Sequence, residues 1–220
     1  MLEDLLKGAM LNYINQHRAG NLDEWKSEPT VVTEDISDKV FGIRDVKGTA
    51  NSIRCERGAG DANYYNGDEG HQYVLRFVRY EEFLDQFRTY NVSGQIDKDW
   101  TKNWSRPDYM AYDISGQNRC MIIHELSKGN IRNKHKDGRL QLLNTVVALS
   151  KIPELKAFLD QYKGCCYCFL SAQGCVEATP SGMADSFMEI YQKLPDPLPI
   201  NNNAIARRGF LAFETKEVKL

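Results

Sequence analysis

The sequence predicts an α/β protein with a central mixed sheet and helices on both of its faces. Short apolar segments predict strands, and in the second half of the chain they alternate with segments of helical periodicity. The length of 220 residues suits a single domain that can bury a substantial core. Hydrophobic residues make up 42% and charged residues 26% of the chain, which is ordinary for a globular protein.

The first residues predict an amphipathic helix and no export signal. Glu3 and Asp4 are acidic where a signal peptide would be basic. The sequence contains no run of 18 apolar residues that could cross a membrane. We therefore expect a cytoplasmic protein without membrane association. The apolar stripe of this helix consists of Leu2, Leu5, Leu6, Met10, Leu11 and Ile14.

Residues 19–106 predict short strands joined by polar loops, with one helix over 80–88. Glycine, asparagine and aspartate crowd residues 58–70, which favours a surface loop within a loop-rich insertion around 45–70. An EF-hand calcium loop does not fit, because Asn66 stands where that loop needs glycine. Residues 90–106 predict a long polar connection. The expected strands are 30–33, 40–43, 52–55 and 72–79.

The second half of the chain predicts a β-hairpin over 107–127, followed by helices and further strands. A basic loop is expected over 128–139. Pro153 cannot continue a helix, so it is expected to open a second one. The expected helices are 138–150, 153–162 and 181–193, and the expected later strands are 165–171 and 210–214.

The hairpin brings two carboxylates together. Gly116 suits the first central position of a type II′ turn, which pairs residues whose numbers sum to 233. Asp113 then faces Cys120, and Asp108 faces Glu125. Directly opposed residues have Cβ atoms about 4.5–5.5 Å apart on one face of the sheet. Two carboxylates at that separation repel each other unless a proton or a divalent cation lies between them.

These residues resemble the PD-(D/E)xK nuclease superfamily, which has a restriction-endonuclease-like core. Pro107 and Asp108 match the Pro-Asp that opens one strand, and Glu125 matches the acid on the next. The following helix and strand come in the expected order, so the resemblance covers about residues 104–172, within a nuclease-like core of about 104–215.

The resemblance implies Mg²⁺-dependent hydrolysis of phosphodiester bonds. Asp108 and Glu125 would hold the metal, with the backbone carbonyl of Leu126 as a third ligand. The lysine of the motif is replaced by Ser127, and Lys128 follows one position later, on the opposite face of the strand unless a bulge re-aims it. Gln141 stands where some relatives have a helical site residue. Residues that could supply the missing charge are Lys134, Lys136 and Arg139.

The basic segment after the hairpin suggests DNA as the partner. Residues 1–100 carry 12 Lys and Arg against 18 Asp and Glu, whereas residues 101–220 carry 16 against 12. Basic side chains beside the candidate site could contact the phosphate backbone. The residues expected there are Arg132, Lys134, Lys136 and Arg139, with Gln141. A homo-oligomer is left open.

Two other groups of metal-ligating residues are better explained as core. His124 precedes Glu125, but no second histidine stands at position 128 to complete a zinc-protease motif, so a packed strand histidine is expected. Four cysteines cluster without the Cys-x₂₋₄-Cys pairs on turns that structural zinc sites use, and small buried side chains are expected. They are Cys165, Cys166, Cys168 and Cys175.

Three hypotheses follow. The leading one is a Mg²⁺-dependent nuclease acting on DNA, based on Asp108, Glu125 and the basic segment. The second is a non-catalytic binding or assembly protein on a degenerate version of the same fold, suggested by Ser127 and the acidic N-terminal half. The third is an α/β protein of another function in which the hairpin matches the motif by chance.

Overall fold

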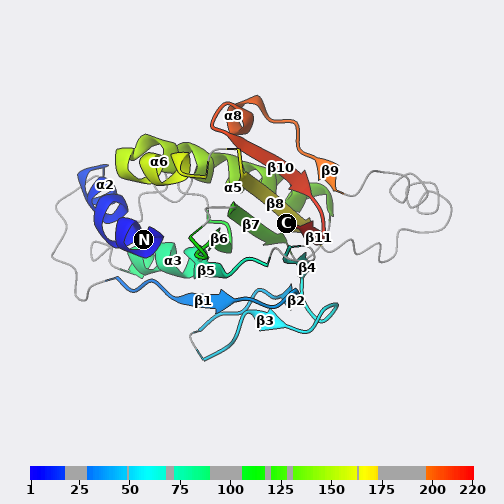
Figure 1. The fold of residues 1–220 in the computed structure, drawn as a ribbon. Coiled ribbons are helices and arrows are strands. Elements are labelled where there is room, and N and C mark those ends of the chain that lie inside the picture. The colour runs from blue at the N-terminus through cyan, green and yellow to red at the C-terminus, as the bar shows by residue number, and fades with distance from the viewer. Residues whose placement is uncertain are drawn as a thin grey trace.

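The structure is a computed structural model that describes residues 1–17, 29–48, 50–67, 72–89, 106–116, 120–127, 131–162, 164–172 and 197–220. Within these ranges the strands form a mixed sheet of seven strands and a second sheet of four (Figure 1). The mixed α/β class expected from the sequence is confirmed. No helix in these ranges is long and apolar enough to span a membrane.

The large sheet is antiparallel on one side and parallel on the other. Neighbours from β1 to β7 are antiparallel, β7 to β8 and β8 to β10 are parallel, and β9 closes the far edge antiparallel to β10. The hairpin strands therefore lie at the centre of the sheet. In spatial order the strands are β1 (Thr33–Ile36), β5 (Leu75–Arg79), β6 (Tyr109–Asp113), β7 (Met121–Ser127), β8 (Cys166–Ala172), β10 (Phe210–Glu214) and β9 (Leu198–Pro199).

Helices and one face of the large sheet share a core. The N-terminal helix buries Leu2, Leu6, Met10 and Ile14 in it. Side chains four residues apart shift gradually around an α-helix, because the helix has 3.6 residues per turn. The π-helical turn in the middle of this segment offsets that shift. The helical segments are α1 (Leu2–Leu5), π-helical η1 (Leu6–Met10), α2 (Leu11–His17), α3 (Tyr80–Thr89), α5 (Ile131–Lys151), α6 (Pro153–Asp160) and α8 (Asn203–Ala206).

The second sheet covers the other face, where the sequence led us to expect helices; within the described ranges the helices gather on the first face. Phe41 stacks on Tyr64 at 5.1 Å between ring centroids, and both rings meet Phe77 of the large sheet edge-on. The strands of this sheet, in spatial order, are β11 (Glu217–Lys219), β4 (Ala62–Tyr65), β2 (Val40–Ile43) and β3 (Arg54–Cys55).

Strand β4 corrects the expectation of a surface loop over residues 58–70. Ala62 and Tyr64 alternate with more exposed neighbours and are buried in the core between the sheets. Gly60 is required by packing, since a Cβ atom there would lie 2.2 Å from the Ile43 carbonyl oxygen. A glycine that permits close approach of two backbones resembles a turn glycine when only the sequence is known.

A buried polar chain links the sheets. The Tyr64 hydroxyl lies 2.6 Å from His124 Nδ1, and His124 Nε2 lies 2.8 Å from Ser171 Oγ. Ser171 in turn donates to the Thr215 carbonyl oxygen at 2.5 Å. Burial lowers the pKa of His124 to about 3, so the ring is neutral. The expectation of a packed, hydrogen-bonded strand histidine is confirmed.

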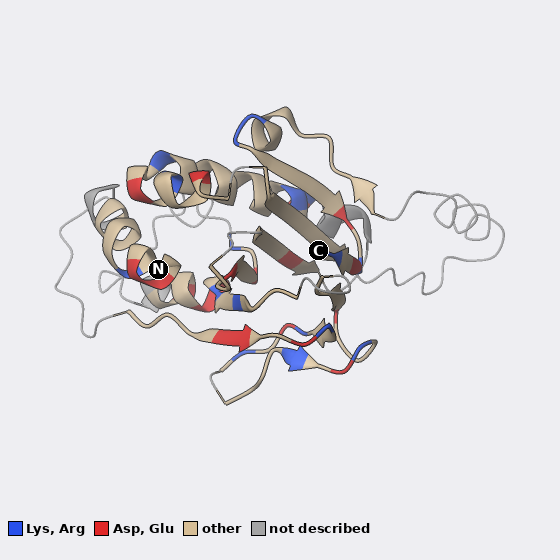
Figure 2. Cartoon of the chain, in the orientation of Figure 1, with Lys and Arg blue, Asp and Glu red and all other residues tan. Residues whose placement is uncertain are grey.

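Edge contacts also hold the sheets together. Strand β1 is acidic and β3 is basic (Figure 2). The Glu34 carboxylate accepts from the Ser52 hydroxyl at 2.5 Å and from the Ile53 N–H at 2.9 Å. Arg54 pairs with Asp38 at 2.6 Å. The loop before β3 is therefore anchored to the edge of the large sheet.

Helix α5 starts at Ile131, seven residues before the expected Gly138, so the predicted loop over 128–139 is wrong from residue 131 onward. Gly138 suggested a helix boundary but is buried inside the helix, against the sheet. The helix over 80–88, the second helix opened by Pro153 and the strand over 210–214 are confirmed. The predicted helix over 181–193 lies outside the described residues.

The cysteines behave as core residues where they are described. Cys166 and Cys168 are buried on β8, and Cys165 is half-buried just before it. Burial raises the pKa of Cys166 to about 12, which keeps this thiol protonated. Cys175 lies outside the described residues.

Candidate metal site at the start of strand β6

The hairpin has the register predicted from its sequence. Met110 pairs with Ile123, and Tyr109 pairs with His124. Gly116 has a φ of 86°, the left-handed backbone that the expected turn requires. The ladder ends at Tyr109 and His124, one residue short of Asp108 and Glu125, so the register that the predicted pairing requires is present. The two carboxyl groups are close enough for the charge of Asp108 to act on Glu125.

Asp108 is held by three backbone groups. Its Oδ2 accepts from the Leu126 N–H at 2.6 Å. Its carbonyl oxygen accepts from the N–H groups of Tyr80 and Glu81, at 3.1 and 3.4 Å, which are the first residues of α3. Unsatisfied N–H groups at a helix start need such acceptors. The result is that Glu81 is fixed beside Asp108.

A third carboxylate comes from the loop that follows β2. The Tyr109 hydroxyl donates to the Arg44 carbonyl oxygen at 2.8 Å and accepts from the Val46 N–H at 3.4 Å. The N–H of Asp45, between them, donates to Asp61 Oδ2 at 2.8 Å. Tyr109 follows Asp108 directly, so this contact brings Asp45 to the start of β6.

Arg79 also holds the loop that follows β2. It is buried, with 3% of its surface exposed. Its guanidinium donates to the carbonyl oxygens of Gly48, at 2.8 Å, and Asn51, and pairs with Glu82 at 3.1 Å. These contacts engage the two terminal nitrogens of the buried guanidinium, while its Nε–H has no hydrogen-bond partner among the described residues. The loop is thus held by Tyr109 before Lys47 and by Arg79 after it.

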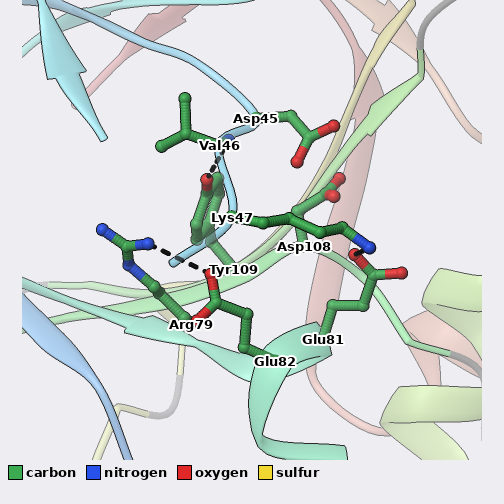
Figure 3. Close-up of a pocket in the computed structure, with 8 residues that line it drawn as sticks. All are labelled: Asp45, Val46, Lys47, Arg79, Glu81, Glu82, Asp108 and Tyr109. Carbon is green, nitrogen blue, oxygen red and sulfur yellow. Dashed lines mark hydrogen bonds and ion pairs between the residues drawn. The ribbon is translucent and has the colours of Figure 1, made fainter. Parts of the chain in front are cut away.

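Carboxylate oxygens of Asp45, Glu81 and Asp108 all lie within 4.8 Å of one another. They line a shallow pocket of about 190 Å³, including the part open to solvent (Figure 3). Lys47 lines it as well, with Nζ 3.6 Å from Glu81 Oε2. The pocket is therefore lined mainly by carboxylates and is open to solvent.

Glu125 lies beside this pocket under helix α5. It is buried, with 8% of its surface exposed. With its amide oriented to donate, the Gln141 nitrogen lies 2.7 and 3.0 Å from the two Glu125 carboxylate oxygens and 3.3 Å from the Arg106 carbonyl oxygen. Gly138, one turn earlier, lets the helix approach, since a Cβ there would lie 2.6 Å from Leu170 Cδ1.

Both hairpin carboxyl groups have raised pKa values. Burial raises the pKa of Glu125 well above its ordinary range, and the charges of Asp108, Glu81 and Asp45 raise it further. Burial also raises the pKa of Asp108, with smaller contributions from Asp45 and Glu81, while the Leu126 N–H lowers it. Without a cation Glu125 therefore retains its proton at neutral pH.

The structure brings some of the predicted site residues together and places others elsewhere. Asp108, Glu125 and Gln141 come together. Ser127 is buried at the end of β7. Leu126 contacts the site through its backbone N–H, which donates to Asp108. Lys128 lies outside the described residues.

The basic residues have a different place from the one expected. Arg132 and Lys134 lie in the first turns of α5, and their side chains are outside the described part of the structure. Lys136 is exposed on the same helix. Arg139 forms an ion pair with Glu214 of β10 at 2.6 Å, so its charge is balanced by another residue of the protein.

Sequence reasoning missed Asp45, Lys47 and Glu81. Glu81 could have been suspected, because it opens a helix that was itself predicted and acidic side chains are common there. For Asp45 and Lys47 the sequence contains no such local indication. They reach the pocket because the second sheet docks on the first.

Comparison with known proteins adds no relative. No protein-family model, no curated protein and no solved structure matches this chain.

Proposed function

We propose that the chain is a Mg²⁺-dependent phosphodiester hydrolase that acts on DNA. The observation that carries the proposal is the convergence of Asp45, Glu81 and Asp108 on one pocket, with Glu125 buried beside them. Oxygen-only ligands with several carboxylates suit Mg²⁺ or Mn²⁺. Raised carboxyl pKa values in a pocket are also typical of functional sites.

Asp45, Glu81 and Asp108 would hold the cation, with Glu125 beside them. The cation would supply a water of lowered pKa and neutralise charge on the phosphate. The chain's own residues keep the ligands in place. The Leu126 N–H fixes the orientation of Asp108, Tyr109 fixes the loop that carries Asp45, and Gln141 fixes the Glu125 carboxylate. Such supporting hydrogen bonds determine how well a site binds its metal.

The first test replaces the two hairpin acids. Asp108→Asn and Glu125→Gln should each reduce Mg²⁺- or Mn²⁺-dependent cleavage of DNA by about 100-fold or more, because each removes a charge from the cation site. Both should remain folded, since each amide has nearly the shape of the carboxyl group it replaces, and the amide oxygen of Asp108→Asn can still accept from the Leu126 N–H. Cleavage of labelled duplex and single-stranded DNA, with RNA for comparison, measures the effect.

The control is Glu154→Gln on the exposed side of α6, which should cleave like the wild type. Mn²⁺ should also raise the melting temperature of the wild type and of Glu154→Gln, but much less that of the two hairpin variants. A wild-type protein that cleaves neither DNA nor RNA with either metal would contradict the proposal.

A second candidate is a non-catalytic binding or assembly protein on the same fold. It is favoured by Ser127, which is buried and neutral where the motif has lysine, and by the pairing of Arg139 with Glu214. This candidate predicts that divalent cations stabilise the protein no more than an equal ionic strength of NaCl.

A further inference from the structure

Lys47 occupies a special position in the candidate site. The pocket brings together the carboxylates of Asp45, Glu81 and Asp108, and among its described lining residues the cations are Lys47 and Arg79. Arg79 is buried, and its two terminal nitrogens donate to Gly48, Asn51 and Glu82. Lys47 is different, because 67% of its side chain is exposed.

The contacts of Lys47 are those of a loosely held counterion. Its Nζ lies 3.6 Å from Glu81 Oε2 and 3.9 Å from Asp85 Oδ2, longer than a hydrogen bond. Ion pairs of this kind at a surface contribute about 0–1 kcal/mol. A divalent cation bound at Glu81 would repel this ammonium and compete with it for the same carboxylate.

The charge of the substrate gives Lys47 a second role. A phosphodiester is an anion, and it must approach a pocket surrounded by carboxylates. An ammonium freed from Glu81 would still be tethered two residues from Asp45, in the lining of the pocket (Figure 3). Arg139, another basic residue considered for this role, is paired with Glu214.

We propose that Lys47 neutralises the acidic cluster when no divalent cation is bound, and contacts the substrate phosphate once a cation has replaced it at Glu81. The inference rests on the proposed function. In this proposal Lys47, in the loop after β2, supplies the positive charge that the motif's lysine would provide and that Ser127 lacks.

The test compares Lys47→Gln and Lys47→Arg with the wild-type protein. In calorimetric titrations, Lys47→Gln should bind Mn²⁺ about three- to tenfold more tightly, because a competing positive charge is gone. In Ca²⁺, its binding to a duplex DNA oligonucleotide, followed by fluorescence anisotropy, should weaken, with a log–log salt slope smaller by about one. Its kcat/KM at saturating Mg²⁺ should fall about tenfold or more. Lys47→Arg should retain the salt slope.

Lys156→Gln is the matched control, because Lys156 is an exposed lysine that pairs with Asp160 on α6. It should behave like the wild type in all three measurements. Unchanged or weaker Mn²⁺ binding by Lys47→Gln, or an unchanged salt slope, would overturn the assignment of Lys47. If the wild type binds Mn²⁺ and cleaves DNA while Lys47→Gln matches it, only this inference fails. A wild type that binds no Mn²⁺ removes the proposed function as well.

Discussion

Glu125 shows how the surroundings of one residue determine its chemistry. It is buried under α5, contacts the Gln141 amide and lies near three other carboxylates. A buried carboxylate in such a place is costly unless it is protonated or balanced by a cation. The raised pKa of Glu125 therefore couples the protonation of the site to the stability of the whole fold.

This coupling predicts that the metal-free protein loses stability as the pH rises. The unfolded chain releases the Glu125 proton near 4.5, the ordinary value, whereas the folded chain retains it to higher pH. The contribution of Glu125 to the free energy of unfolding is then fully present below pH 4.5 and declines above it, by up to about 1.4 kcal/mol per pH unit for one group. Urea unfolding in EDTA, from about pH 5 to about pH 8, should show a shallower decline for Glu125→Gln than for wild type. A steeper decline in the variant would contradict the prediction.

At the scale of elements, the approach of α5 to the sheet sets the position of Glu125 and Gln141. Gly138 makes that approach close, because a Cβ there would lie 2.6 Å from Leu170 Cδ1 on β8. Leu170 is fully buried and has little room to move. A glycine inside a helix lowers its intrinsic stability by about 1 kcal/mol, and here tight packing against β7 and β8 offsets that cost.

Gly138→Ala should therefore destabilise the protein although alanine favours helix. Overpacking a core costs about 1–3 kcal/mol, which exceeds the gain in helix propensity of about 1 kcal/mol. In a Leu170→Ala background the same change should become neutral or stabilising, since the crowding atoms are gone. Urea unfolding of the four proteins measures this coupling. Lys136→Ala, at an exposed position of the same helix, should change stability by less than about 0.5 kcal/mol.

At the scale of the whole molecule, the protein is two sheets with a core between them, and the candidate site lies where they meet. Tyr64 of the second sheet and His124 of the large sheet form a buried contact in the centre of that interface. Loss of one partner of a buried hydrogen bond costs about 1–3 kcal/mol, because the remaining group is left without a partner.

Tyr64→Phe should lower the free energy of unfolding by about 1–3 kcal/mol, since it leaves His124 Nδ1 buried without its hydroxyl partner. Tyr167→Phe is the control: this ring is half-buried and stacks on Phe169 at 5.9 Å, which the change preserves. Equal stabilities of Tyr64→Phe and the wild type in urea unfolding would show that the contact contributes nothing net.

The hairpin could be predicted because its information is local. Alternating residues and the glycine at position 116 determine its register, and that register brings Asp108 and Glu125 to the same end of the hairpin. The succession of helices and strands along the chain after the hairpin was predicted from the apolar runs. Gln141 was named from the family resemblance.

The rest of the site depends on contacts that are distant in the sequence. Asp45 is placed by Tyr109 and Arg79, and neither contact leaves a local pattern. Strand β4 was missed because glycine, asparagine and aspartate around Gly60 suggested a loop, and the start of α5 was missed because its first residues are basic and polar. Gly60 and Gly138 in fact permit close packing. Glycine conformations and close approaches are properties of the tertiary structure.

The attachment of the Asp45 loop to Tyr109 bears on when the protein could become active. The hairpin closes a short stretch of chain and can form early, whereas the contact of Tyr109 with Arg44 closes a long one. A partly folded chain would therefore present Asp108 and Glu125 without Asp45. Its acidic pocket would be complete only after the two sheets have docked, so the candidate cation site would form late in folding.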